Sequence, residues 1–185
     1  ERMGGQAGVH SVPGQGSTFW FTARLGRLAA SEAGAGTSNH ATRPGDAIRL
    51  GYAGTWVLVA EDDEINQLVA RELLESVGLR VDIANDGLDA VERMQSPQAA
   101  RYALILMDMQ MPRLDGLDAT RQIRALPGVG KLPIVAMTAN AFGEDRARCL
   151  DAGMDDFVSK PVEPDVLYDK MLGYFVRGAT STRAA

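Results

Sequence analysis

The stretch Leu104–Pro112, with the sequence LILMDMQMP, decides the fold: a short apolar run delivers one carboxylate, Asp108, and is then interrupted by proline. An apolar run of this length that ends in a turn is typical of a β-strand buried on both faces. We therefore expect Asp108 where the strand leaves the sheet, which is a costly place for a carboxylate unless another group pairs with it. A structural ion pair or a helix cap is the alternative role for this side chain.

The composition excludes several classes of protein. The chain has 185 residues and a formal net charge of −5, and no cluster of Lys and Arg forms a stripe, so we expect no nucleic-acid partner. No apolar run approaches the roughly 18 residues of a membrane helix, so we expect no membrane contact by this chain. Cys149 is the only cysteine, which excludes an intramolecular disulfide. The chain opens at Glu1 and not at methionine, so we expect a fragment of a longer protein.

The first part of the chain has a different composition from the rest. Within residues 1–25, two runs rich in β-formers, Val9–Val12 and Thr18–Ala23, flank the turn signal Pro13–Ser17. Two strands cannot bury a core alone, so we expect this piece to be incomplete. Residues 26–54 are mostly small and polar, which predicts a flexible linker.

From Thr55 to Arg177, apolar strand-like runs alternate with runs of helical periodicity, and residues 178–185 are expected to form a tail. Five successive strand–helix units predict an α/β fold with a parallel sheet and helices on both faces. The expected strands are 56–60, 79–84, 102–107, 133–138 and 156–159, and the expected helices are 65–77, 87–95, 116–125, 143–152 and 162–175.

Polar side chains stand at the ends of four of the five expected strands. In such a sheet, ligands bind at the carboxyl ends of the strands. Each side chain also has an ordinary alternative role: Asp63 as a helix cap, Thr138 as a strand-end hydroxyl and Lys160 as a surface charge. Their joint placement at one edge nevertheless indicates a site, formed by Glu61-Asp62-Asp63, Asp108, Thr138-Ala139 and Lys160-Pro161.

The electrostatics of this cluster suggest its chemistry. Two carboxylates about 4–5 Å apart repel by roughly 3–4 kcal/mol at an effective dielectric constant near 20, so a cation is needed, and Mg²⁺ suits carboxylate ligands. Lys160, the Thr138 hydroxyl and the Ala139 amide could hold a phosphoryl group, with Asp108 as the nucleophile that accepts it. Trp56 lies on the strand that leads to the acid pair, so we expect its fluorescence to report the metal.

Residues 55–177 closely resemble the receiver domain of two-component signalling, in which the acid pair, the DMQMP stretch, the Thr-Ala pair and the Lys-Pro pair occur in this order and spacing. The resemblance implies a flavodoxin-like receiver fold with strand order 2-1-3-4-5. It also implies that Asp108 is the phosphoacceptor. Glu61, Asp62, Asp108 and the backbone carbonyl of Gln110 would hold Mg²⁺, with Asp62 as the more direct ligand of the acid pair.

The resemblance also assigns the remaining polar residues. Thr138 corresponds to the switch hydroxyl and Lys160 to the phosphate-binding lysine, followed by a bond to Pro161 that is commonly cis. Phe157 corresponds to the switch aromatic, which is often tyrosine in the family. Asp63 departs from the asparagine usual in this subtype, and we expect it to cap the following helix.

The N-terminal piece resembles the end of a histidine-kinase ATPase domain, because Gly14–Phe19 matches its last glycine-rich box and the start of its final strands. We therefore expect the C-terminal segment of a hybrid sensor histidine kinase, cytoplasmic itself, from a parent that can be anchored in the inner membrane. The upstream nucleotide-binding boxes are absent, and His10 and His40 lie in no phosphodonor context. Whether this chain alone is an enzyme stays open.

Three functions are consistent with such a site. In the first, the receiver takes phosphoryl from the phosphohistidine of a kinase core and relays it to a histidine phosphotransfer domain. In the second, it is a phosphorylation-switched interaction module without relay. The third is an aspartyl-phosphate hydrolase, but those enzymes carry a second acid two residues after the nucleophile, where this chain has Gln110. Homodimer formation stays open.

Overall fold

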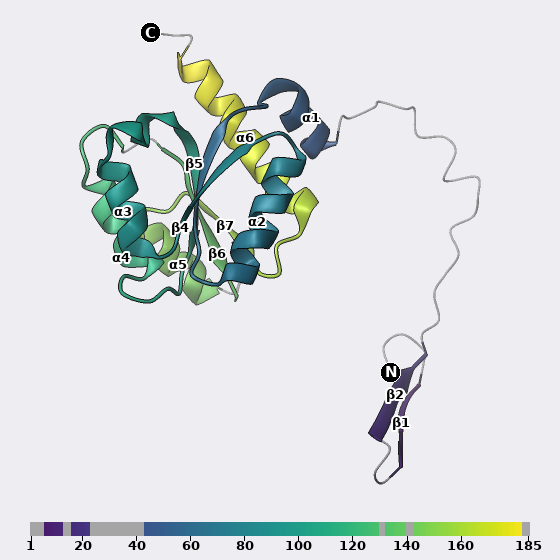
Figure 1. The fold of residues 1–185 in the computed structure, drawn as a ribbon. Helices are drawn as coiled ribbons and strands as arrows, with labels where there is room; N and C mark the ends of the chain where they lie inside the picture. The colour runs from purple at the N-terminus through teal and green to yellow at the C-terminus, as the bar shows by residue number, and fades with distance from the viewer. Residues whose placement is uncertain (1–5, 13–15, 23–42, 130–131, 140–142, 183–185) are drawn as a thin grey trace. The chain divides into compact units, whose positions relative to one another are not determined.

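The computed structural model describes residues 6–12, 16–22, 43–129, 132–139 and 143–182, which fall into two units, Glu1–Ala41 and Thr42–Ala185 (Figure 1). The described part of the first unit is an antiparallel hairpin of β1 (Ala7–Val12) and β2 (Gly16–Phe21). The two expected strands are thus confirmed. The turn at residues 13–15 and the expected linker over residues 26–42 lie outside the described residues.

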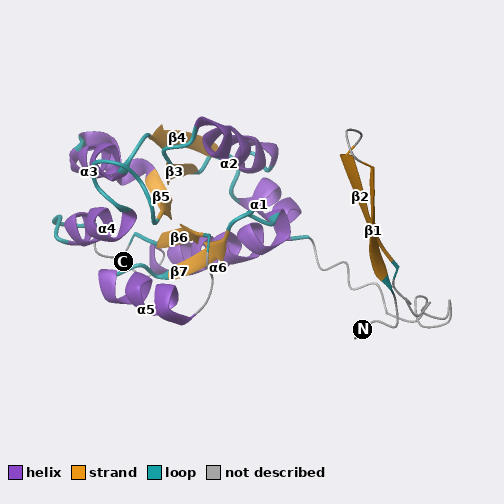
Figure 2. Cartoon of the chain, turned by 90° about the horizontal axis from the view of Figure 1, so that it is seen from below, coloured by secondary structure: helices purple, strands orange, loops and turns teal. Residues whose placement is uncertain are grey.

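The second unit is built on a five-stranded parallel sheet with the order β4-β3-β5-β6-β7, which confirms the predicted order. Helices cover both faces, with α1, α2 and α6 on one and α3, α4 and α5 on the other (Figure 2). The strands are β3 (Trp56–Ala60), β4 (Arg80–Ala84), β5 (Tyr102–Asp108), β6 (Ile134–Thr138) and β7 (Asp156–Ser159). The helices are α1 (Pro44–Gly51), α2 (Glu64–Ser76), α3 (Gly87–Gln95), α4 (Gly116–Arg124), α5 (Gly143–Ala152) and α6 (Pro164–Thr182).

The central strands bury both of their faces, as their uninterrupted apolar runs predict. In β5, Ile105 and Met107 belong to the core under α3, α4 and α5. Leu104 and Leu106, which alternate with them, belong to the core under α1, α2 and α6. A polar side chain at any of these positions would be cut off from water, so the first place where β5 can offer a carboxylate to solvent is its end, at Asp108.

The predicted linker is wrong over its last part, because α1 lies within residues 26–54. Ile48 of α1 is fully buried in the core, and Gly45 packs so closely on Tyr168 that a Cβ there would lie 3.1 Å from the ring. Directly after the helix, the ring of Tyr52 packs on that of Phe175, with centroids 5.2 Å apart. The average composition of the segment concealed these few apolar anchors, which attach α1 to the receiver unit.

The predicted end of the last helix is also wrong. α6 runs on to Thr182, so most of the expected tail over residues 178–185 is helical; residues 183–185 lie outside the described part. A short 3-10 helix, η1 (Pro97–Arg101), precedes β5 and was not predicted. None of the helices that the structure describes is both long enough and apolar enough to cross a membrane.

The packing of α1 leads to the first prediction. Because Ile48 is fully buried whereas Leu50 of the same helix is 83% exposed, Ile48→Ala should lower the free energy of unfolding by about 2–3 kcal/mol, as expected for deletion of buried methyl groups. Leu50→Ala is the matched control and should change it by less than about 0.5 kcal/mol. Urea unfolding of the full chain measures both. Equal effects of the two substitutions would mean that α1 is not part of the receiver unit.

Candidate functional site

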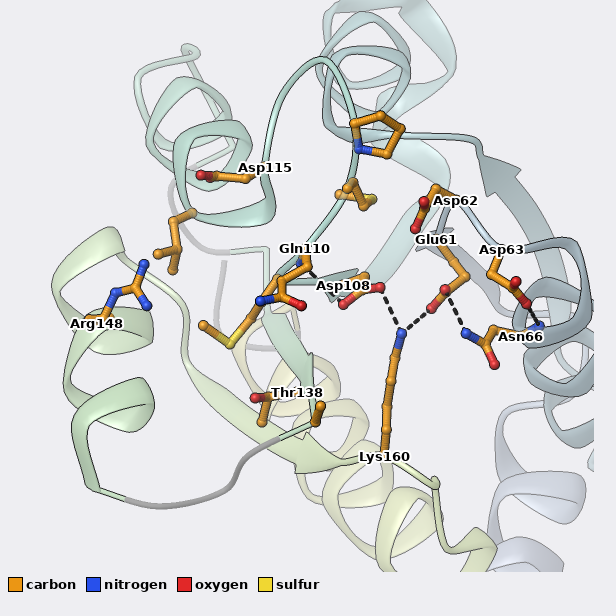
Figure 3. A pocket seen from close by; sticks show the side chains of 15 residues that line it. Glu61, Asp62, Asp63, Asn66, Asp108, Gln110, Asp115, Thr138, Arg148 and Lys160 are labelled. Atoms are coloured by element: carbon orange, nitrogen blue, oxygen red, sulfur yellow. Dashed lines mark hydrogen bonds and ion pairs between the residues drawn. The ribbon is translucent and has the colours of Figure 1, made fainter.

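A cleft of about 740 Å³ opens at the carboxyl ends of the parallel strands (Figure 3). Every residue that the sequence predicts to bind metal or phosphate lines it: Glu61, Asp62, Asp108, Gln110, Thr138, Ala139 and Lys160. They come from the ends of β3, β5, β6 and β7 and the loops that follow. The parallel sheet brings these distant parts of the sequence together, because all its strands end at the same edge.

Three carboxylates form the acidic part of the cleft. Glu61, Asp62 and Asp108 each offer one oxygen, and these oxygens lie within 4.8 Å of one another. Glu61 is only 1% exposed and Asp108 7%, whereas Asp62 is exposed. Two buried carboxylates so close together need a compensating positive charge.

Lys160 supplies that charge. Its Nζ lies 2.7 Å from Glu61 Oε2 and 2.7 Å from Asp108 Oδ2, and thus bridges the ends of β3 and β5. Burial alone would lower the pKa of Lys160, but the two carboxylates outweigh this effect and raise the pKa above its ordinary value. The ammonium group is therefore charged at neutral pH. The Lys160–Pro161 bond is cis, as the family resemblance implies.

The other predicted phosphate ligands surround Asp108. Thr138, the last residue of β6, is buried at the wall of the cleft, and Ala139 follows at its rim. Beside them, the backbone N–H of Gln110 donates to Asp108 Oδ1 over 3.2 Å. The second oxygen of Asp108 is held by Lys160, so the orientation of the carboxylate is fixed from both sides.

Asp63 has the role expected of it. Its Oδ1 accepts hydrogen bonds from the backbone N–H groups of Ile65, at 3.0 Å, and Asn66, at 2.9 Å, so it caps α2. It lies on the rim of the cleft but is not among the three clustered carboxylates.

The sequence analysis missed several residues of the cleft. Asn66 Nδ2 donates to Glu61 Oε1 over 2.9 Å, so that with Lys160 both oxygens of Glu61 are engaged. Its place in the first turn of the helix after the acid pair was the signal that could have revealed it. Arg148 reaches the cleft from α5, and Asp115 lines it at the start of α4 (Figure 3). No local pattern in the sequence pointed to Arg148.

Two aromatic side chains lie away from the cleft. Phe157 on β7 is half-buried and stacks with Arg146, whose Cζ lies 5.8 Å from the ring centroid, and with Lys170, whose Nζ lies 5.4 Å away. Trp56 begins β3, five residues before Glu61, and Arg80 and Arg101 pack over its ring. At about 3.3 Å per residue, Trp56 lies near the opposite end of the strand from Glu61, and a fluorescence response of Trp56 to the metal stays a prediction.

The family model of the response regulator receiver domain matches residues 57–172. The chain belongs to the response regulator receiver family. Among curated relatives, the aerobic respiration control sensor protein ArcB of Escherichia coli is 36% identical over 168 residues, which cover 90% of this chain and 20% of ArcB. Several curated relatives are far longer than this chain, which spans between 5% and 26% of their lengths.

Two solved structures show the same fold. The receiver domain of the sensor histidine kinase PA1611 from Pseudomonas aeruginosa, with a magnesium ion in its active-site cleft, is 42% identical, with a TM-score of 0.61 over 66% of this chain and 98% of that one. The receiver domain of Ssk1 from Saccharomyces cerevisiae, solved with the histidine phosphotransfer protein Ypd1, is 29% identical, with a TM-score of 0.60 over 66% and 89% of the two chains.

The bridging ammonium leads to the second prediction. In Lys160→Met, Glu61 and Asp108 lose their shared partner and repel each other, so the free energy of unfolding at pH 7 should fall by about 2 kcal/mol, less than the 3–5 kcal/mol for breaking a fully buried pair. In the variant only the repulsion between the two carboxylate charges remains, and a lower pH reduces that repulsion. The difference in unfolding free energy between the wild-type chain and Lys160→Met, here called the deficit, should therefore shrink as the pH is lowered from 7 to 5.

Lys170→Met is the matched control for this experiment. Lys170 Nζ also lies 2.7 Å from a carboxylate, that of Asp156, but a single one, and both side chains are 27% exposed. Loss of this ion pair in Lys170→Met should lower the free energy of unfolding by less than about 1 kcal/mol. Thermal unfolding at the two pH values measures both variants. A deficit of Lys160→Met that stays constant or grows at pH 5 would contradict the pairing of Lys160 with the two carboxylates.

Proposed function

We propose that this chain is the phosphoacceptor receiver of a phosphorelay, which takes a phosphoryl group from a phosphohistidine onto Asp108. The supporting observation is the position of Asp108: it ends the central strand β5, is 7% exposed, and lies between the Gln110 N–H and the Lys160 ammonium in a cleft with two further acids. A carboxylate with only a structural role would not need an acid pair beside it.

The transfer is a displacement at phosphorus. An oxygen of Asp108 attacks the phosphorus atom, the P–N bond breaks, and its electron pair stays on the histidine nitrogen, so that the ring leaves as neutral imidazole when its other nitrogen carries a proton. The Thr138 hydroxyl and the Ala139 N–H would donate hydrogen bonds to the phosphoryl oxygens, and Lys160 would exchange one carboxylate partner for a phosphoryl oxygen.

Glu61, Asp62, Asp108 and the Gln110 carbonyl would hold Mg²⁺, since oxygen donors clustered within 4.8 Å suit this cation. When bound, Mg²⁺ would neutralise charge on the phosphoryl oxygens. The magnesium ion of the PA1611 receiver supports this assignment. We also assign Thr138 and Phe157 as the switch pair, in which the Thr138 hydroxyl follows the phosphoryl group and Phe157 moves into the vacated space.

The acceptor assignment leads to the third prediction. Acetyl phosphate with Mg²⁺ should add one phosphoryl group to the wild-type chain, and Asp108→Asn should abolish this labelling because it removes the nucleophile. Asp115→Asn, which changes another acid of the same cleft, is the control and should be labelled normally. Asp62→Ala and added EDTA should stop labelling through loss of the metal. Intact mass spectrometry measures labelling in each case, and labelling of Asp108→Asn would refute the assignment.

The proposed partner is a histidine phosphotransfer domain. Three apolar side chains of α2, Ile65, Leu68 and Val69, are 71%, 59% and 50% exposed. Their spacing places them on one helix face. Asp63 and Asn66, at the start of the same helix, line the cleft, so the apolar face lies next to the site. Exposed apolar groups beside a charged cleft are typical of a protein contact, and the solved Ypd1–Ssk1 complex shows such a partner for a related receiver.

The apolar face of α2 leads to the fourth prediction. The test uses the histidine phosphotransfer domain to which the wild-type chain transfers phosphoryl fastest. With this domain, Leu68→Asp should slow transfer from phosphorylated Asp108 about tenfold, which corresponds to about 1.4 kcal/mol of interface energy. Labelling by acetyl phosphate should be unchanged, because the small donor needs no docking face.

Leu50→Asp is the control, since it adds the same charge at an exposed leucine of α1. Equal transfer rates in the two variants would show that α2 is not the docking face. Transfer from the wild-type chain to none of the phosphotransfer domains of the source organism would contradict the relay and favour the switched interaction module.

The parent protein is proposed to be a hybrid histidine kinase. The match to ArcB covers 90% of this chain and so extends beyond the receiver match at residues 57–172. The hairpin of β1 and β2 agrees with the end of a kinase ATPase domain over residues 1–25. The receiver itself would span residues 55–177, preceded by α1 as an attached helix.

A further inference from the structure

We propose that the ion pair between Asp86 and Arg113 is a clamp on the loop between β5 and α4, and that it positions this loop for Mg²⁺. Residues 109–115 form the loop, which begins directly after Asp108 and carries the Gln110 carbonyl. The inference rests on the proposed function, because it concerns the affinity of that same site for its metal. Asp86 and Arg113 are positioning residues and not ligands.

Arg113 has an unusual backbone conformation. Its φ is +62°, and among the residues that the structure describes it is the only one other than glycine with a positive φ. A side chain with a Cβ costs about 1–2 kcal/mol in this region of conformational space. A residue in this conformation persists only where contacts with its surroundings hold it there. For Arg113, one such contact is the ion pair of its guanidinium group.

That partner, Asp86, is fixed in place. Its side chain is 5% exposed, and it caps α3 by accepting a hydrogen bond from the Asp89 N–H over 2.9 Å. Arg113 donates to the other carboxylate oxygen. Burial alone would raise the pKa of Asp86, but the Asp89 N–H and Arg113 outweigh it and hold the pKa below its ordinary value. A charged carboxylate that is buried and hydrogen-bonded at the start of α3 therefore anchors Arg113 of the loop.

Hydrogen bonds and close packing hold several points of the loop: the Gln110 N–H donates to Asp108 Oδ1 over 3.2 Å, and the Leu114 N–H donates to the Pro112 carbonyl over 2.7 Å. Gly116 lies so close to the start that a Cβ would approach the Asp108 carbonyl oxygen to 2.0 Å, and its N–H donates to the Met109 carbonyl over 3.1 Å. Near the other end, the Gly87 N–H donates to the Leu114 carbonyl over 3.2 Å. The ion pair of Arg113 adds a side-chain contact that ties the part of the loop after the Gln110 carbonyl to the start of α3. Loss of the ion pair should let the carbonyl move and weaken the metal site.

The side chain of Arg113 is 59% exposed, so replacing it does not open the core. In Arg113→Gly the ion pair is lost and glycine adopts the positive φ without strain, but glycine also frees the backbone, so Asp86→Asn is the variant that isolates the ion pair. Asp86→Asn removes the charge but keeps a good helix cap. Each should raise the dissociation constant for Mg²⁺ about tenfold, the lower end of the effect of residues that support metal ligands. Arg113→Lys should raise the dissociation constant less. The double variant of Arg113→Gly and Asp86→Asn should raise it no more than the single substitutions do.

The experiment is calorimetric titration of the full chain with MgCl₂, without phosphodonor, after thermal unfolding has shown that each variant is folded. Arg121→Gln is the matched control: it breaks an exposed ion pair with Asp118 on α4 and should leave the dissociation constant unchanged. Dissociation constants of Arg113→Gly and Asp86→Asn within twofold of the wild-type value would overturn the clamp.

The outcomes separate the two proposals. If the wild-type chain binds Mg²⁺ and Asp108 is labelled, but both variants bind as tightly as wild type, the clamp is wrong and the proposed function stands. If the wild-type chain does not bind Mg²⁺, or Asp108→Asn is still labelled by acetyl phosphate, the proposed function is wrong and the clamp falls with it. If Arg113→Gly does not fold, the clamp is judged on Asp86→Asn and Arg113→Lys alone.

Discussion

The Lys160 ammonium between the carboxylates of Glu61 and Asp108 is the interaction on which the rest of the site depends. Two carboxylates buried this deeply and this close together would otherwise favour protonation or separation of their strands. The lysine places a positive charge between the two carboxylates and offsets their repulsion, which supports the proposal that Asp108 is the nucleophile. An ammonium group is also a mobile point charge, able to turn from a carboxylate to a phosphoryl oxygen, which a rigid guanidinium could do less readily.

This constraint explains the arrangement of the sheet around the site. The ammonium can reach both carboxylates only if β3, β5 and β7 end at the same edge, and the order β4-β3-β5-β6-β7 provides this. Aspartates start the helices that follow the strands: Asp63 caps α2, Asp86 caps α3 and Asp115 caps α4. Each accepts a hydrogen bond from at least one backbone N–H at this same edge, so the three clustered acids are not used as helix caps.

Much of this could be predicted from the sequence because its strongest signals are local. The apolar runs of β3, β5 and β6 are typical of buried strands, and the polar side chains that end or follow them then meet at one edge of the sheet. The cap at Asp63 also follows from its place before a helical pattern. By contrast, α1 is attached by a few contacts, such as that of Ile48, which average composition does not show. Arg113 acts through Asp86, a partner 27 residues away that only the folded chain brings near, so no local pattern marks it.

The measurement that tests the account most directly is a crystal structure of this chain with Mg²⁺ and beryllium trifluoride, which mimics a phosphoryl group on a carboxylate. The account predicts the beryllium on an oxygen of Asp108, with Lys160 Nζ within hydrogen-bond distance of a fluorine. It also predicts that Glu61, Asp62, Asp108 and the Gln110 carbonyl hold Mg²⁺. Beryllium bound to another carboxylate, or Lys160 still bridging Glu61 and Asp108 with no contact to fluorine, would contradict it.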